Sequence, residues 1–328
     1  MKLLSNLTRK VNTTLSTIIV SILILCTYSL QAAKPLPIVA ISQFISHEAV
    51  DSTYKGLIDE LKKQGYIDGK TIKVVHKNAA GNMGTNASIA NLIKSIDPTV
   101  AVGLTTPSAQ SLVGIKAPLV FSIITDPIEA KLVKTLYRPG GNITGVSDMP
   151  PHVKQIELIK AILCNAKLIA VPYNPGESNS VRQVEIIKTV AQKHGLKVQT
   201  IPVSSSAQIK IALSKAIGAD AFLIPLDNIL VGAMPTVIGC AKEMKIPVFT
   251  SEYESVIKNQ ALACVGYSYY DMGAETGKIV ARILKGEKPG DIDVSAPYGA
   301  DYYFNLKAAK SLNIQISGDL LKKAKIVK

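Results

Sequence analysis

Short apolar runs alternate with longer amphipathic stretches along the chain from Pro37 onward. The apolar runs are rich in β-branched residues, which predicts buried strands. The stretches between them repeat apolar residues at helical spacing, as at Ile89, Leu92, Ile93 and Ile96, which predicts amphipathic helices. Strands that alternate with helices form βαβ units around a parallel sheet, so the pattern predicts an α/β protein.

The first half of the pattern ends near residue 148. Its predicted strands cover residues 38–41, 71–75, 99–104, 119–124 and 143–146. Its predicted helices cover residues 49–63, 82–95, 108–113 and 128–136. Asp126 is placed to cap the last of these helices, and Pro127 is placed as its first residue.

The second half repeats the scheme. Its predicted helices cover residues 153–163, 178–194, 207–217, 229–244 and 270–285. Its predicted strands cover residues 168–173, 198–203, 221–225, 248–250 and 262–267. The tail, residues 302–312 and 320–325, is predicted to add an edge strand and helices.

Two consecutive α/β halves predict two doubly wound parallel-sheet lobes joined by a multi-strand hinge. A chain of 328 residues also exceeds what one compact domain usually holds. We expect residues 35–147 with about 272–295 to form lobe one, and residues 148–271 with about 296–328 to form lobe two. The chain is expected to cross between the lobes near residues 145–150, 268–275 and 290–300. Hinge residues are predicted at Gly145, Ser147 and Asp148.

The first 33 residues have the layout of a cleaved secretory signal peptide. Lys2, Arg9 and Lys10 precede a short apolar run, Leu15 to Cys26, and small residues follow at Ala32 and Ala33. The run is too short for a comfortable membrane span. A lipid anchor is not expected, because Leu25 stands where a lipoprotein has a small residue. We therefore expect export to the periplasm.

The charge and cysteine content change this picture little. Without residues 1–33 the 37 basic residues fall to 34, and 34 − 24 acidic residues leave a net charge of +10. The lysines are scattered and not interleaved with aromatic residues, so we expect a solvated surface and no nucleic-acid partner. Three cysteines would remain, Cys164, Cys240 and Cys264, and their odd number argues against a disulfide framework.

The sequence carries no recognisable catalytic or metal-binding motif. His47, His76, His152 and His194 are isolated, with no second ligand at metal-site spacing. Neither a G-x-S-x-G elbow nor a G-x-G-x-x-G loop follows a predicted strand. We therefore expect no enzyme, no metal and no cofactor.

Polar residues recur where the predicted strands end. The segments that contain them are Ser42-Gln43-Phe44, Thr105-Thr106-Pro107, Thr125-Asp126-Pro127, Asn174-Pro175, Asp227-Asn228 and Ser251-Glu252. Ligands of open α/β sheets bind outside the carboxyl ends of the strands. Each residue also has a simpler interpretation as a helix cap, and both roles can hold together.

This mixture of residues suits a zwitterion. Thr105, Thr106 and nearby amides are suited to a carboxylate. Asp227 or Asp126 is suited to an ammonium, because a charge removed from water needs a partner. Phe44 or Tyr173 is placed to cover an apolar side chain.

Several segments resemble the substrate-binding proteins of ABC transporters, in particular the family that includes predicted tryptophan and tyrosine importers. They include QFISHEAVDSTYKGLIDELKKQGYIDGK, FSIITDPIEAKLV, RPGGNITGVSD, YNPGESNS and GYSYYDMGAETGKIVARILKGEKPGDI. The resemblance covers the chain beyond the signal peptide. It implies a type I periplasmic-binding fold, closure of two lobes on a small ligand, and delivery to a membrane permease.

By position, the cleft residues of that family fall on six segments of this chain. They are Gln43 to His47, Thr105 to Pro107, Thr125 to Pro127, Asn174 to Ser178 with Glu177, Asp227 with Asn228, and Ser251 with Glu252. We expect a monomeric receptor for an amino acid, with aromatic amino acids among the candidates, that delivers its ligand to a permease. A sugar or nucleobase receptor of the same fold, and a ligand-sensing regulator-like domain, remain as alternatives.

Overall fold

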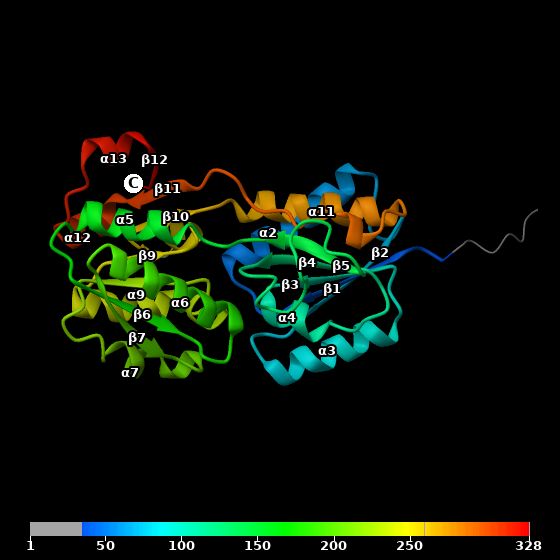
Figure 1. Cartoon of the computed structure of the whole chain (residues 1–328), viewed down its shortest axis with the longest axis horizontal. Coiled ribbons are helices and arrows are strands. Elements are labelled where there is room, and N and C mark those ends of the chain that lie inside the picture. Colours follow the sequence, from blue (N-terminus) through cyan, green and yellow to red (C-terminus); the bar gives the residue numbers. More distant parts are fainter. Residues whose placement is uncertain (1–34, 259, 328) are drawn as a thin grey trace, which may run out of the picture. The chain divides into compact units, whose positions relative to one another are not determined.

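A computed structural model describes residues 35–258 and 260–327 (Figure 1). The predicted signal peptide lies outside these residues. The described strands form two separate sheets, and helices cover both faces of each sheet. This arrangement confirms the predicted α/β class with two lobes.

The sheet of lobe one has the strand order β2-β1-β3-β4-β5, and all its neighbouring strands are parallel. Its strands are β1 (Ile38–Gln43), β2 (Lys73–Asn78), β3 (Val100–Leu104), β4 (Leu119–Ile124) and β5 (Ile143–Ser147). Helices α2 (Glu48–Lys63) and α11 (Tyr269–Leu284) pack on one face, and α3 (Met83–Ser95) with α4 (Thr106–Ser111) on the other. Lobe one therefore contains a helix from late in the chain.

Glycines allow α2 and α11 to lie in backbone contact. A Cβ atom added to Gly56 would meet the carbonyl oxygen of Tyr270 at 2.0 Å. A Cβ atom added to Gly273 would meet the carbonyl oxygen of Thr53, also at 2.0 Å. Only glycine fits at such a distance, so these two positions set the separation of the helices.

The sheet of lobe two has the order β12-β11-β10-β9-β8-β6-β7, in which only the β10–β11 pair is antiparallel. Its strands are β6 (Leu168–Tyr173), β7 (Lys197–Pro202), β8 (Ala221–Ile224), β9 (Val248–Thr250), β10 (Ala263–Gly266), β11 (Asp301–Asn305) and β12 (Ala324–Val327). The antiparallel pair departs from the wholly parallel sheet that the pattern predicts.

Helices also cover both faces of the second sheet. One face carries α5 (His152–Ile162), α6 (Ser178–Lys193) and α12 (Leu306–Ser311). The other carries α7 (Ile209–Leu213), α8 (Asn228–Gly232), α9 (Met234–Met244) and α10 (Glu254–Lys258), and α13 (Gly318–Lys322) precedes β12. A single helix is predicted over residues 229–244, but the structure divides it into α8 and α9.

Both lobes use the same strand order once the two added strands are set aside. The order β7-β6-β8-β9-β10 repeats β2-β1-β3-β4-β5. In such a sheet the ligand crevice lies outside the carboxyl ends of the strands, where the order reverses. That point falls between β1 and β3 in lobe one, and between β6 and β8 in lobe two.

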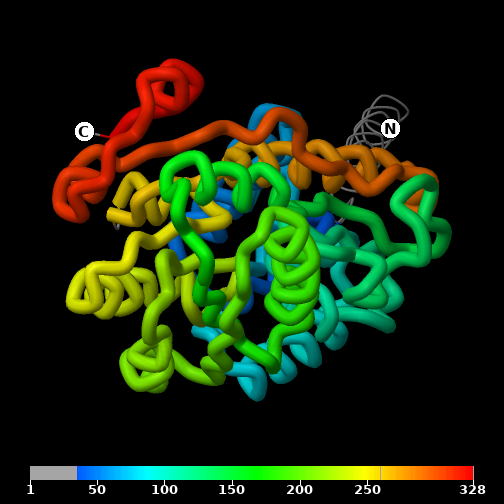
Figure 2. The backbone as a smooth tube through the Cα atoms, turned by 60° about the vertical axis from the view of Figure 1, so that its left-hand side comes forward, coloured from blue at the N-terminus to red at the C-terminus, as the bar shows by residue number. Residues whose placement is uncertain are grey.

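The chain passes between the two sheets three times. The passages follow β5, follow β10, and precede β11; the last runs in orange to red in Figure 2. Val146 and Ser295 form a bridge, and the Ser147 amide donates to the Ser295 carbonyl at 2.8 Å, so the first and third passages run side by side. Gly145 lies inside β5 against Phe121, whereas Asp148 begins the first passage.

The predicted helix over residues 128–136 is wrong. The Asp126 carboxylate accepts from the amides of the two residues after Pro127, as a cap would, but Lys131 then adopts φ +59° and the chain continues in turns. Leu132 and Val133 are buried with Phe121 under β4. Their burial outweighs the local preference for a longer helix.

Other structural features bear on the predicted chemistry. Cys164, Cys240 and Cys264 are free thiols. Within residues 35–258 and 260–327 no group of three or more potential ligands is arranged to hold a metal ion. Over the same residues, no helix has the length and apolar character needed to cross a membrane.

Candidate ligand-binding site

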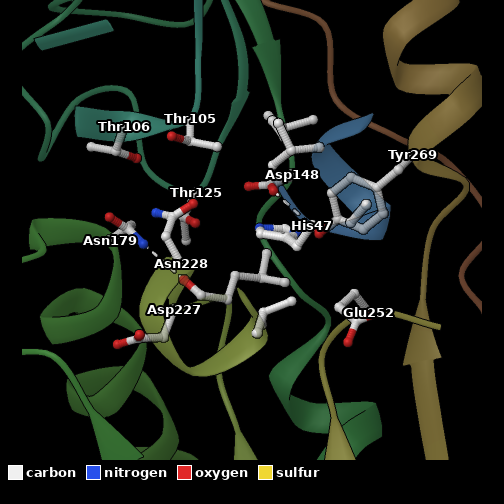
Figure 3. Close-up of a pocket in the computed structure, with 15 residues that line it drawn as sticks. His47, Thr105, Thr106, Thr125, Asp148, Asn179, Asp227, Asn228, Glu252 and Tyr269 are labelled. Carbon is white, nitrogen blue, oxygen red and sulfur yellow. Dashed lines mark hydrogen bonds between the residues drawn. The ribbon is translucent and has the colours of Figure 1, made fainter. Parts of the chain in front are cut away.

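A cavity lies where the carboxyl ends of the strands of both sheets meet (Figure 3). Lobe one and its α11 contribute His47, Ala49, Val50, Thr105, Thr106, Ile123, Thr125 and Tyr269, and the first passage contributes Asp148. Lobe two contributes Asn179, Leu226, Asp227, Asn228, Val231 and Glu252. The cavity volume is about 30 Å³, which holds one or a few water molecules. The walls that the two lobes contribute therefore leave little free space between them.

Buried polar atoms without a hydrogen-bond partner are concentrated around this cavity. They are His47 Nδ1, Thr105 Oγ1, Asp148 Oδ1, Asn179 Oδ1 and Glu252 Oε1. Native proteins leave few such atoms unpaired, because each costs about 1–3 kcal/mol. Their presence in both lobes around one space indicates a polar ligand that bonds to both lobes.

Two cavity residues have a strained backbone. Thr105 has φ +71° and Ile123 has φ +54°, a region that β-branched residues rarely occupy. Thr105 joins β3 to α4, and Ile123 lies at an irregularity in the pairing of β4 with β5, where the strand bends. Strain of about 1–3 kcal/mol per residue persists mainly at functional sites, so both residues support the assignment of this cavity.

Asp148, at the start of the first passage between the lobes, is a carboxylate that faces the cavity. In Figure 3 its side chain lies between Thr105 and His47. One oxygen, Oδ2, accepts from the Tyr269 hydroxyl at 3.3 Å, and the other has no partner. Burial raises the pKa of Asp148 to about 7, although the neighbouring Thr125 and Tyr269 side chains favour its ionised form.

In lobe two, Glu177 holds Asn228 against the cavity. Its Oε2 atom accepts from the Asn228 backbone amide at 3.2 Å and from the Asn228 side chain at 2.5 Å. Burial and the nearby charge of Asp227 raise the pKa of Glu177 to about 7. Asn179 is fixed separately, because its Nδ2 donates to the Leu226 carbonyl at 2.7 Å.

Asp227 is buried and accepts four hydrogen bonds from its own lobe. Oδ1 accepts from the Ile229 and Leu230 amides at 3.1 and 3.0 Å, which caps α8. Oδ2 accepts from the Asn174 amide at 2.5 Å and the Ser180 hydroxyl at 2.6 Å. The predicted pairing of Asp227 with an ammonium is therefore not supported, and the capping interpretation accounts for this residue.

Asp126 also has a partner within the protein. Its carboxylate accepts from Arg182 Nε of lobe two at 3.0 Å, so it joins the lobes instead of facing the cavity. Gln110 donates to Ser178 at 3.4 Å close by. On another side Lys258 pairs with Glu48. We call these three pairs the cross-lobe contacts.

The structure brings about half of the predicted site residues to the cavity. They are His47, Thr105, Thr106, Thr125, Asp227, Asn228 and Glu252, together with the predicted hinge residue Asp148. Gln43 instead bonds to Asp51 and His76 beside the loop before α2. Phe44 lies in the core of lobe one with Ile93, so its predicted contact with a ligand side chain is not supported.

The remaining predicted residues do not line the cavity, but they form hydrogen bonds with residues close to it. The Pro107 carbonyl accepts from Asn86, and Asn174 bonds to the Gly176 amide and to Glu177. Glu177 positions Asn228, and Ser178 takes part in a cross-lobe contact.

Seven lining residues were not predicted from the sequence. They are Ala49, Val50, Ile123, Asn179, Leu226, Val231 and Tyr269. Most are apolar, and an apolar residue at a strand or helix end looks like a core residue in the sequence. Tyr269 could have been suspected, because it is an aromatic residue within the predicted crossing that follows the strand over residues 262–267.

The lining chemistry limits what the cavity can bind. It combines two carboxylates that have an unpaired oxygen, Asp148 and Glu252, with neutral hydroxyl and amide groups and an aliphatic wall. None of the lining residues is a lysine or arginine. A ligand with a cationic group and an apolar part matches this surface.

Comparison with known proteins identifies the family to which the chain belongs. A family model described as "ABC transporter substrate binding protein" matches residues 38–328. The chain belongs to this family. Its members bind solutes for transport and are not enzymes, and they interact with permeases.

Relatives of this substrate-binding protein carry informative names. The chain described here is 36% identical to the "Tyrosine-binding protein" of Clostridioides difficile over 87% of this chain and 83% of that protein. It superposes on an ABC domain from Streptococcus pneumonia in complex with L-Trp with a TM-score of 0.86, 36% identity, and coverage of 89% of this chain and 100% of that one.

A third comparison concerns conformation. The ligand-free, open structure of a substrate-binding protein with adhesive properties from Clostridium difficile has 34% identity and covers 89% of this chain and 99% of that one. Its TM-score is only 0.68. The substrate-binding protein described here therefore resembles the L-Trp complex more closely than this open form, although the two identities are nearly equal.

Proposed function

We propose that this chain is an exported receptor of an ABC importer that closes its lobes around an amino acid, with tyrosine and tryptophan as the first ligands to test. The observation that carries the proposal is the group of unpaired buried polar atoms from both lobes around one cavity. The Tyr- and Trp-binding relatives support the choice of ligand. A periplasmic location is part of the proposal.

Each part of an amino acid has suitable partners on the lining. Thr105, Thr106 and Thr125 offer neutral hydroxyl donors for the carboxylate. The aliphatic side chains of Val50, Leu226 and Val231 suit an apolar ligand side chain. A neutral sugar would leave the buried carboxylates of the cavity without a counter-charge, so an amino acid is favoured over a sugar or nucleobase.

Ligand exchange requires the lobes to separate. The cavity is far smaller than an aromatic amino acid, and its walls come from both lobes. We propose that the three passages between the sheets act as the hinge, with Ser147 and Asp148 at the first of them. A ligand that bonds to both lobes shifts the population toward the closed form that a permease recognises.

Binding experiments test this function. We expect the purified chain without its signal peptide to bind L-tyrosine or L-tryptophan in isothermal titration calorimetry, and mass spectrometry to find the amino acid retained after purification. Small-angle scattering is expected to show a smaller radius of gyration after ligand is added to stripped protein. Absence of binding to every common L-amino acid, with sugars or nucleobases bound instead, contradicts the proposal.

The cross-lobe contact between Asp126 and Arg182 predicts an effect away from the cavity. Arg182→Ala is expected to weaken amino-acid binding about two- to fivefold, because a partly exposed ion pair contributes about 0.2–1 kcal/mol and this one joins the lobes. Titration calorimetry measures the change, which shrinks at high salt. Lys188→Ala on the same helix is the control, since Lys188 is exposed. If both variants bind the amino acid equally weakly, the lost positive charge and not the ion pair between Asp126 and Arg182 is the cause.

A further inference from the structure

We infer that Asp148 is the residue that binds the α-ammonium group of the ligand, from a position on the first passage between the lobes. The inference rests on the proposed function, because it presupposes an amino-acid ligand. Three carboxylates line the cavity, namely Asp148, Asp227 and Glu252. Their hydrogen bonds distinguish among them.

Asp227 is excluded by its four internal hydrogen bonds, which use both carboxylate oxygens within lobe two. A carboxylate oxygen that already accepts two bonds has little capacity for another donor. Asp227 therefore positions Asn174 and α8, and does not bind the ligand's charge.

Glu252 is engaged within lobe two as well. Its Oε2 atom accepts from the Ser255 amide at 2.8 Å at the start of α10. The neighbouring Glu254 is buried, and burial together with the charge of Glu252 raises the pKa of Glu254 to about 9. The Glu252 carboxylate is therefore held by the backbone of α10, beside a second buried carboxyl group.

The Asp148 carboxylate is held by one long hydrogen bond. It is 4% exposed, and among residues 35–258 and 260–327 Oδ1 has no partner and Oδ2 accepts only from the Tyr269 hydroxyl, at 3.3 Å. The titratable groups around it are Tyr269 and Tyr267 near the second passage and His47 before α2. None of them is a cation at neutral pH, because burial lowers the pKa of His47 to about 4.

The arrangement of donors and acceptors favours the same residue. The ammonium and carboxylate of an α-amino acid are attached to one carbon atom, so their protein partners must be neighbours. In Figure 3 Glu252 lies at the opposite end of the cavity from Thr105 and Thr106, and Asp148 is drawn between these two ends. Thr125 is close enough to Asp148 to favour its ionised form. Thr105 Oγ1 is itself buried and unpaired. Asp148 and Thr105 together form a site for the two charged groups of one ligand.

Ligand analogues test the inference directly. The wild-type protein is compared with Asp148→Asn and Glu252→Gln for binding of L-tyrosine and of 3-(4-hydroxyphenyl)propionate, which lacks the ammonium group. We expect the wild-type protein to bind the deaminated compound on the order of 30-fold more weakly, as for loss of a charged hydrogen bond. Asp148→Asn is expected to reduce this ratio to within a few-fold, and Glu252→Gln to preserve it. L-tryptophan and indole-3-propionate serve as a second pair.

The outcomes separate this inference from the proposed function. If Glu252→Gln removes the discrimination and Asp148→Asn keeps it, the ammonium lies at Glu252 and the inference is overturned while the function stands. If the wild-type protein binds none of the amino acids, the function fails and the inference fails with it. Thermal unfolding of each variant identifies a variant that has not folded, and for that case the wild-type pH dependence decides.

The pH dependence of wild-type binding is the second measurement. An ammonium ligand binds the ionised form of Asp148, whose pKa is about 7 without ligand and is lower beside a cation. Affinity for L-tyrosine is therefore present above pH 7 and falls up to tenfold per pH unit as the pH drops below 7. The deaminated analogue is expected to lose no affinity over the same range. An equal loss for both compounds overturns the inference.

Discussion

Replacing Asp227 with alanine is expected to lower the free energy of unfolding by about 3–5 kcal/mol. The carboxylate accepts four hydrogen bonds from Asn174, Ser180, Ile229 and Leu230, and it is fully buried. Its removal leaves those donors unpaired and uncaps α8. Urea unfolding followed by circular dichroism measures the change, and ligand affinity should fall in parallel because Asn228 moves.

Two further variants isolate the cause. Asp227→Asn retains one carbonyl oxygen for the α8 cap and is expected to lose less stability. Asp319→Ala removes a carboxylate that is 89% exposed, and it should change the free energy of unfolding by no more than about 0.5 kcal/mol. If Asp227→Ala keeps full stability but loses amino-acid binding, the carboxylate acts on the ligand after all.

The second large effect is expected at the contact of α2 with α11. Gly273→Ala should lower the free energy of unfolding by about 2–3 kcal/mol, because its Cβ atom would meet the Thr53 carbonyl oxygen at 2.0 Å and the helices must move apart. Alanine normally increases helix stability by about 1 kcal/mol relative to glycine, and the expected net loss already includes this opposing gain. Chemical denaturation quantifies the net effect.

Gly239→Ala is the matched control. Gly239 lies in α9, is exposed, and has no atom within 4 Å of an added Cβ. This variant is expected to be neutral or more stable by up to about 1 kcal/mol. A loss of stability at both positions would show that the close helix contact is not the cause.

The hydrophobic pattern was sufficient to predict most elements of the fold. Strand β9 and helices α2 and α11 lie within about one residue of the predicted ranges. The prediction failed where a long-range contact decides the local structure. Burial of Leu132 and Val133 replaces a predicted helix with turns, and pairing with β10 makes β11 antiparallel. Neither contact can be recognised from the local pattern of apolar and polar residues.

The site could be predicted only as a region. Polar residues at strand ends marked the correct side of each sheet, and His47, Thr105 and Asn228 do line the cavity. Sequence could not show that Ser180 also binds Asp227 or that Arg182 binds Asp126, because these partners lie on other elements. Nor could it show that Asp148, on the passage between the lobes, keeps a buried oxygen free.

The contact between α2 and α11 also affects the order of folding during synthesis. The apolar face of α2, with Val50, Leu57 and Leu61, is covered by a helix that ends only at Leu284. Lobe two likewise lacks β11 and β12 until the last residues are made. A ribosome-bound chain therefore cannot complete either lobe early, and long-range contacts of this kind slow folding. Both lobes gain their final cores together, when nearly the whole chain has been synthesised.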